Sequence, residues 1–327
     1  MTVRKTESRI PANFQASDLG EAVVSADARC ALVSFITSPI VVGRENAYVV
    51  YVTDAGLASS VQSYEWSFIE NGGTPSVQST EHGECSYVPT AVGLLDLSVR
   101  LLGAGNAQLS SLSLAQDIVA TNVELESLVT EVKNQPGPAV SNPTVARELI
   151  NDHNPYYQDV NLQTPETGEG FKRFVFSVVF DGALQRTQGE RKRHLEELSV
   201  SLNNQAADFA VLAGKGAGVS GIRLALLAMI LPDMLAFTEL PEAPEQHALA
   251  DEELRDTLAA LDAEKRIDLF NLARCPKSNI TLCAKIIEAL RDRYFAGTNF
   301  DDVLAGMSGT RAHWIIKHFR EGPLKRS

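Results

Sequence analysis

The sequence has few residues that could cross-link the chain or ligate a metal. It contains only four cysteines in 327 residues: Cys30, Cys85, Cys275 and Cys283. No two of them have Cys-x-x-Cys spacing, and no histidine is placed to complete a zinc site with them. Cys275 and Cys283 are close enough to cross-link a loop, although buried free thiols are the simpler interpretation. The sequence therefore predicts no metal site and no bound cofactor.

Long hydrophobic segments are also scarce. Residues 1–21 contain no apolar run, so no secretory signal peptide is expected and synthesis in the cytoplasm is predicted. The most apolar stretch, Gly218–Phe237, includes Arg223, Pro232 and Asp233, each of which is costly in hydrocarbon. It predicts a buried core helix of a soluble domain, with a membrane span as the alternative. No membrane insertion is expected.

Basic side chains are outnumbered. The chain has 29 Lys and Arg against 41 Asp and Glu, a formal net charge of −12. This charge repels phosphate backbones and anionic lipids, so nucleic acid is not expected as a partner. Gly216–Gly221 matches the G-x-G-x-x-G pattern, but a nucleotide site needs a βαβ unit and no further parallel strands are found. A helix–helix connection is preferred over a nucleotide site.

Apolar periodicity divides the chain. Residues 1–28 are polar and predict an N-terminal tail. Over residues 29–120 apolar and polar side chains alternate, for example along Tyr64–Phe68 and Leu95–Leu101, which predicts an all-β sandwich. Prolines and glycines at 136–138 mark a linker over 121–145.

Residues 146–327 predict a mainly helical domain. Apolar side chains near its start recur at the helical spacing i, i+3, i+4, i+7, i+8, but the same stretch is rich in Val and Phe, so a strand remains open. These side chains are Phe171, Phe174, Val175, Val178 and Val179. The sequence thus indicates two domains, which is also the expectation from its length.

Four segments of the first domain resemble a PKD-type immunoglobulin-like domain. They are Tyr64-Glu65-Trp66-Ser67-Phe68, Asn71-Gly72, Tyr87-Val88-Pro89 and Gly93–Val99. The resemblance implies an immunoglobulin-like sandwich with Trp66 as its central core residue. Domains of this family mostly space, dock or bind, and it implies no catalytic residue.

Three segments of the second domain resemble, in order and spacing, the lytic transglycosylase and goose-type lysozyme family. They are Leu226–Asp233, Cys275–Leu290 with Asn279-Ile280 opening a helix, and Val303–Gly309 followed by Trp314. The resemblance covers about residues 200–322. It implies a lysozyme-like fold for the helical domain and peptidoglycan, or another glycan, as the ligand.

The resemblance also implies a site. Asp233 falls on the position of the catalytic acid, Glu239 is a substitute nearby, and Asn279, Met307 and Ser308 stand at substrate-binding positions. Glycoside cleavage needs a carboxylic acid held neutral, and the apolar helix before Asp233 favours that. However, Asp is one methylene shorter than the family's Glu, and Met307-Ser308 replaces a Tyr-Asn pair. A solvated, helix-terminal role for Asp233 is the alternative.

Two functions from different classes follow. The first is a muramidase or lytic transglycosylase on a PKD-type spacer that acts on peptidoglycan. By analogy, it would be part or cargo of a phage-tail-like contractile injection particle, with protein partners there, and be released with that particle. The second is a catalytically inactive structural or interaction protein that uses the same two modules.

Overall fold

The computed structural model describes residues 9–120, 171, 174–175, 178–179, 188–203, 208–230, 251–305, 315 and 319. These residues form two compact units. The first contains residues 9–120, with the short segment 275–277 grouped to it, and the second contains the other described residues from 171 onward. The expected linker over 121–145 lies outside the described residues.

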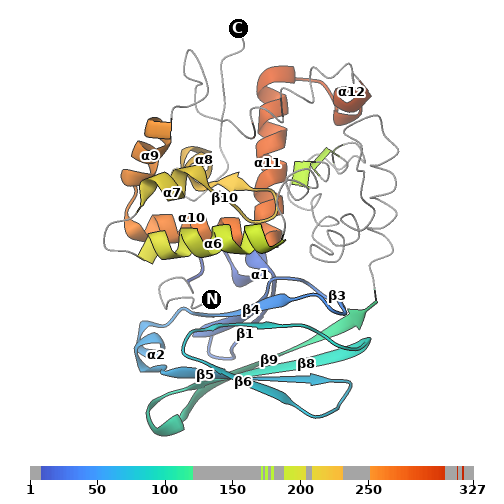
Figure 1. Ribbon diagram of the computed structural model, residues 1–327, viewed down its shortest axis with the longest axis vertical. Helices are drawn as coiled ribbons and strands as arrows, with labels where there is room; N and C mark the ends of the chain where they lie inside the picture. Colours follow the sequence, from blue (N-terminus) through green and yellow to red (C-terminus); the bar gives the residue numbers. More distant parts are fainter. Residues whose placement is uncertain are drawn as a thin grey trace. The chain divides into compact units, whose positions relative to one another are not determined.

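The first unit is rich in strands and also contains short helices (Figure 1). Its elements are α1 (Ala16–Leu19), β1 (Glu21–Val24), β2 (Cys30–Ser34), β3 (Ile40–Val41), β4 (Asn46–Val52), α2 (Ala55–Ser60), β5 (Ser63–Glu70), β6 (Ser76–Thr80), β7 (Glu84–Tyr87), β8 (Gly93–Leu102), the 3₁₀ turn η2 (Ala104–Asn106) and β9 (Gln108–Val119). Both α1 and β1 lie in the segment expected to be a tail.

Hydrogen bonding divides these strands into two sheets, of order β1-β2-β4-β7 and β3-β9-β8-β5-β6. The strands curl into a half-barrel, so the expected all-β immunoglobulin-like sandwich is wrong. The unit is mixed, because it contains the short helices α1 and α2 beside the strands. Asp54 caps α2 by accepting a hydrogen bond from the Leu57 amide at 2.7 Å. In addition, β3 pairs with β9 in parallel, with Ile40 opposite Ile118, whereas the other described pairs of this sheet are antiparallel.

The core of the first unit lies between the facing sides of the strands. Along β5, Tyr64, Trp66 and Phe68 are buried while the residues between them are more exposed. The Phe68 ring lies 5.7 Å from the ring of Tyr48 on β4, measured between centroids. The opposite face of the five-stranded sheet carries Ser67, Asp96, Ser98 and other polar side chains.

The second unit is helical with one small hairpin (Figure 1). Its elements are α6 (Gln188–Asn203), α7 (Phe209–Gly214), β10 (Gly216–Ala217), β11 (Ile222–Arg223), α8 (Leu224–Ile230), α9 (Asp251–Ala259), α10 (Ala263–Arg274), α11 (Pro276–Phe295) and α12 (Phe300–Ala305). In the described part of the chain, no helix is both long and apolar enough to cross a membrane.

The helix-or-strand question near the start of this unit is settled for the five residues concerned. All five are helical and buried, and Phe171 and Phe174 contact the Phe300 ring with centroid distances of 4.8 and 5.6 Å. On α11 buried side chains recur at 280, 283, 287 and 290, a helical spacing, and residues between them, such as Leu282, Ala284 and Ile286, are buried as well. Any helix with one buried face shows this spacing, and the lysozyme-like fold predicted partly from it is wrong.

Candidate functional site

The structure describes only part of the site that the sequence predicts. Asp233, Glu239, Met307 and Ser308 lie outside the described residues, so their predicted roles are untested. Asn279 is described, on the second turn of α11. The structure therefore places one of the five residues, and its surroundings show what that residue does in the fold.

The Asn279 amide is fully buried and bonded to the backbone of two other segments. Its Oδ1 accepts hydrogen bonds from the amide and hydroxyl of Ser220, at 2.9 and 2.6 Å. Its Nδ2 donates to the carbonyl oxygens of Ala217 and Ala273, at 3.1 and 2.7 Å. This side chain fastens the hairpin between α7 and α8 to the junction of α10 and α11, and its polar atoms are occupied by these contacts.

The same hairpin contains the G-x-G-x-x-G sequence. β10 and β11 pair antiparallel, with Ala217 opposite Ile222, and no helix follows β10 directly as a dinucleotide site would require. Gly218 has φ +68°, and a Cβ there would lie 2.1 Å from the Ala273 carbonyl oxygen. Gly218 therefore allows close packing within the unit, and the segment between α7 and α8 forms a short hairpin.

A second buried polar cluster, which the sequence analysis did not predict, lies in the N-terminal unit. Gln116 on β9 accepts a hydrogen bond from the Tyr48 hydroxyl at 2.9 Å. Its Nε2 donates to Glu21 Oε2 at 2.6 Å and to the Ile36 carbonyl at 2.9 Å. Asn46 and Ser34 extend the network. These buried groups are satisfied internally, so they stabilise one arrangement of β1, β2, β4 and β9.

A third polar cluster controls the loop between β7 and β8. Glu70, the last residue of β5, accepts hydrogen bonds from the Tyr87 hydroxyl (2.8 Å), the Thr90 amide and hydroxyl (both 2.7 Å) and the Ala91 amide (3.0 Å). The next residue, Asn71, accepts from the Leu94 amide at 2.9 Å and donates to the Val92 carbonyl at 3.2 Å. Two consecutive side chains therefore hold the second half of the loop and the start of β8.

The titration of these groups agrees with the geometry. Partial burial would raise the pKa of Glu70, but the hydrogen bonds from Thr90, Tyr87 and Ala91 outweigh it, and its pKa lies below the ordinary value. Burial, and then the hydrogen bond to Glu70, raise the pKa of Tyr87 to about 12. At neutral pH the carboxylate is thus an acceptor and the phenol a donor.

The loop held by Glu70 and Asn71 presents aliphatic side chains to solvent. Val92 is 58% exposed, and Leu94, the second residue of β8, is 41% exposed. Leu94 pairs with Asp117 of β9, and the next outward rung brings Ile69, Asp96 and Ala115 into line across three strands. Exposed apolar side chains gathered at one place are a common mark of an interaction surface.

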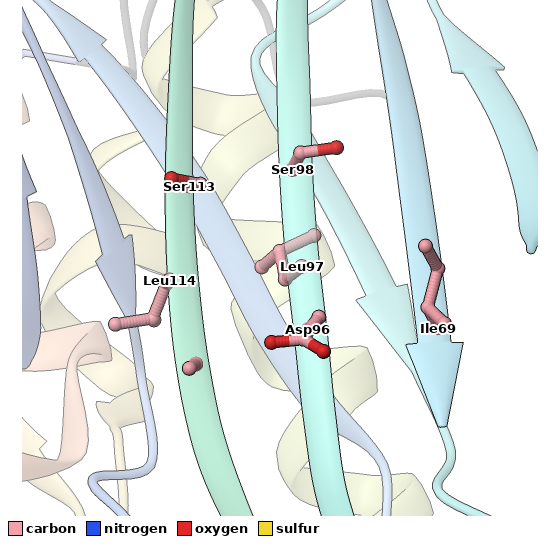
Figure 2. A pocket seen from close by; sticks show the side chains of 7 residues that line it. Ile69, Asp96, Leu97, Ser98, Ser113 and Leu114 are labelled. Carbon is pink, nitrogen blue, oxygen red and sulfur yellow. The ribbon is translucent and has the colours of Figure 1, made fainter. Parts of the chain in front are cut away.

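A shallow hollow of about 200 Å³ opens on this face (Figure 2). Its lining residues come from β5, β8 and β9: Ile69, Asp96, Leu97, Ser98, Ser113, Leu114 and Ala115. In Figure 2 the Asp96 side chain lies between Ile69 of β5 and strand β9, with the serines one rung away. We call Ile69, Leu94, Asp96, Ser98, Ser113, Ala115 and Asp117 the outer-sheet patch.

The patch offers binding chemistry rather than a catalytic arrangement. Its carboxylates are exposed, and its hydroxyls belong to serines that no histidine of the patch accompanies. Among the residues that the structure describes, no three His, Cys, Asp or Glu side chains lie close enough together to hold a metal ion. All four cysteines are buried, and none of them forms a disulfide.

Comparisons with known proteins do not assign the chain to a family. No known protein family matches the sequence, and no curated protein matches it. A solved structure of a family 76 glycoside hydrolase from a bovine Bacteroides thetaiotaomicron strain is 13% identical over 56% of this chain and 40% of that chain, with a TM-score of 0.23. A β-1,2-glucanase from Parabacteroides distasonis is 12% identical over 89% of this chain and 37% of that chain, with a TM-score of 0.24.

This chain thus spans less than half the length of either enzyme, and TM-scores this low do not indicate a shared fold. The comparisons give no support to a PKD-type domain or to a lytic transglycosylase, and both resemblances are wrong. Their motifs have a simpler origin. Aromatic and polar residues can alternate along any half-buried strand, and any helix that packs on one face has a stripe of apolar residues. Carriage in a phage-tail-like particle is likewise unsupported.

Proposed function

We propose that this protein is an interaction protein that binds another protein through the outer-sheet patch. The supporting observation is the loop between β7 and β8. This loop and the start of β8 expose Val92 and Leu94, while Glu70 and Asn71 hold the segment by the six hydrogen bonds described above, four of them to backbone groups. A fold that leaves aliphatic side chains in water while fixing the segment that carries them favours binding.

Fixing the loop in advance matters for affinity. Ordering a loop or an immobilised side chain on binding costs free energy, and a surface that is already ordered avoids that cost. Gly93, with φ +141°, lets β8 start directly against Asn71, because a Cβ there would lie 1.8 Å from Asn71 Oδ1. The sequence thus keeps a glycine where the loop must fit closely beside its anchor.

Site-specific photocrosslinking tests the proposal. A benzophenone amino acid is placed at Leu94 in the full chain, in cells that normally produce it, and at Val24 as the control. Val24 is a 55% exposed aliphatic residue of β1, outside the patch. We expect a discrete protein adduct from position 94 and not from position 24. No adduct at position 94, or equal adducts at both positions, would overturn the proposal.

The sequence also predicts a glycan as the partner, and a second experiment tests whether the outer-sheet patch binds one. Purified peptidoglycan sacculi and a soluble β-glucan are incubated with the wild-type chain and with Leu94→Asp. Binding to either glycan that is lost in Leu94→Asp, without a protein adduct at position 94, would assign the patch to glycan instead. Glycan binding unaffected by Leu94→Asp leaves the patch to a protein partner and places glycan recognition elsewhere in the chain.

A further inference from the structure

We infer that the partner segment places a lysine or arginine side chain in the hollow beside Asp96, with aliphatic residues next to it. This inference rests on the proposed function and specifies the chemistry of the partner. It combines three observations on the same face: the shape of the hollow, its lining, and the charge around it.

The hollow has the form that a long basic side chain needs. Ile69 and Ala115 give it apolar walls on either side of β8, and Asp96 lies between them on the same rung. Ser98 and Ser113 pair one rung further along and offer hydroxyl oxygens as additional acceptors. Lysine and arginine lay their methylene groups along apolar surface and keep the charged end at polar groups.

The charge of the patch favours a cation. Asp96 and Asp117 are diagonal neighbours on adjacent strands, because Asp96 pairs with Ala115 and Asp117 pairs with Leu94. Neither forms an ion pair with any side chain that the structure describes. The cation on the same strand, Arg100, is engaged by Glu65. The chain carries a net charge of −12, which steers basic partners toward it.

Leu94 and Val92 define what lies beside the basic residue. Leu94 lies two residues before Asp96, on the same outward face of β8. A partner whose cation reaches Asp96 therefore covers Leu94 with the residues that flank this cation. Those neighbours are expected to be aliphatic, since a polar residue there would gain nothing from covering Leu94. The partner sequence is therefore aliphatic with Lys or Arg among the aliphatic residues.

The test extends the crosslinking experiment by one position. The benzophenone residue is placed at Ala115, which faces Asp96 across the rung, and the adducted partner peptide is sequenced by mass spectrometry. We expect a Lys or Arg close to the attachment point. In Asp96→Asn, the adduct yield is expected to fall about two- to fivefold, the range for an exposed ion pair. In Asp96→Lys it is expected to fall further.

Glu81→Lys is the matched control, because Glu81 is exposed, lies outside the patch and changes the net charge by the same amount. If Glu81→Lys lowers the yield as much as Asp96→Lys, only the overall charge matters and the inference fails. An adducted peptide without a basic residue, or an adduct between two copies of this chain, also overturns it. In those cases an adduct at position 94 still supports the proposed function, whereas no adduct at 94 or 115 overturns both.

Discussion

The carboxylate of Glu70 accepts two hydrogen bonds from one residue, Thr90, whose amide and hydroxyl both lie at 2.7 Å. The two residues are twenty positions apart, so this contact joins the end of β5 to the loop that follows β7. The loop carries the exposed side chains on which the proposed function rests. We therefore expect this contact to contribute to the free energy of unfolding and to the conformation of the loop surface.

Replacement of Glu70 by glutamine should lower the free energy of unfolding by about 1–3 kcal/mol, since charge-assisted hydrogen bonds are lost and an amide NH₂ faces donors. Urea denaturation measures the change. Glu65→Gln is the control. Glu65 pairs with Arg100 on the exposed sheet face, and such a pair contributes at most about 1 kcal/mol. Equal losses in the two variants would contradict the anchoring role of Glu70.

The contribution of Glu70 should also depend on pH in one direction. Its pKa in the folded chain lies below the ordinary value of 4.5, because the hydrogen bonds to the charged form outweigh partial burial. A depressed carboxyl pKa gives stability that is present above the unfolded pKa and is lost as pH falls through the folded pKa. The stability difference between wild type and Glu70→Gln should stay constant from pH 7 to about 5.5 and shrink below about 4.5. A difference that grows in acid would contradict it.

Gly218→Ala and Gly297→Ala should differ although both glycines have positive φ, +68° and +76°. The left-handed backbone costs each alanine about 1–2 kcal/mol. Only at position 218 would the new Cβ meet other atoms, namely the Ala273 carbonyl oxygen at 2.1 Å and the Asn279 amide at 2.4 Å, whereas nothing lies within 4 Å of position 297. We expect an additional loss of about 1–3 kcal/mol for Gly218→Ala. Matching thermal midpoints would show that the hairpin is not fastened as described.

Trp66→Ala should lower the free energy of unfolding by about 3–5 kcal/mol through the cavity it leaves. The indole is fully buried, and its Nε1 donates to Thr80 Oγ1 at 2.9 Å. Val77→Ala on the neighbouring strand β6 is the comparison, because Val77 is 60% exposed and should change stability by no more than about 0.5 kcal/mol. Chemical denaturation followed by circular dichroism distinguishes the two.

The sequence predicted the strands that have one face in the core and one in water. The alternation along Tyr64–Phe68 and Leu95–Leu101 is reproduced in the burial of β5 and β8. It could not predict β2, since all five residues Cys30–Ser34 are buried and no alternation marks the strand. Nor could it predict the β3–β9 pair, because a two-residue strand carries no periodic signal.

The candidate site could not be predicted from the sequence. Nothing in the sequence distinguishes Glu70 from the other acidic residues, since its partners at 87, 90 and 91 meet it only after β5, β7 and β8 have formed. The motif assigned Asn279 to a substrate-binding position, whereas in the structure its amide binds the backbone of its own unit. A buried amide that organises a loop and one that binds a ligand look the same in a single sequence.

The parallel pairing of Ile40 with Ile118 also has a consequence for synthesis. About 80 residues separate the two partners, and at 5–20 residues per second roughly 4–16 s pass between their emergence. Until β9 is made, the nascent chain has no partner strand for β3, and the Tyr48 hydroxyl of β4 lacks its acceptor, Gln116. Contacts this distant in sequence form slowly. The pairing of β3 and the buried polar cluster around Gln116 therefore form only after the ninth strand has left the ribosome.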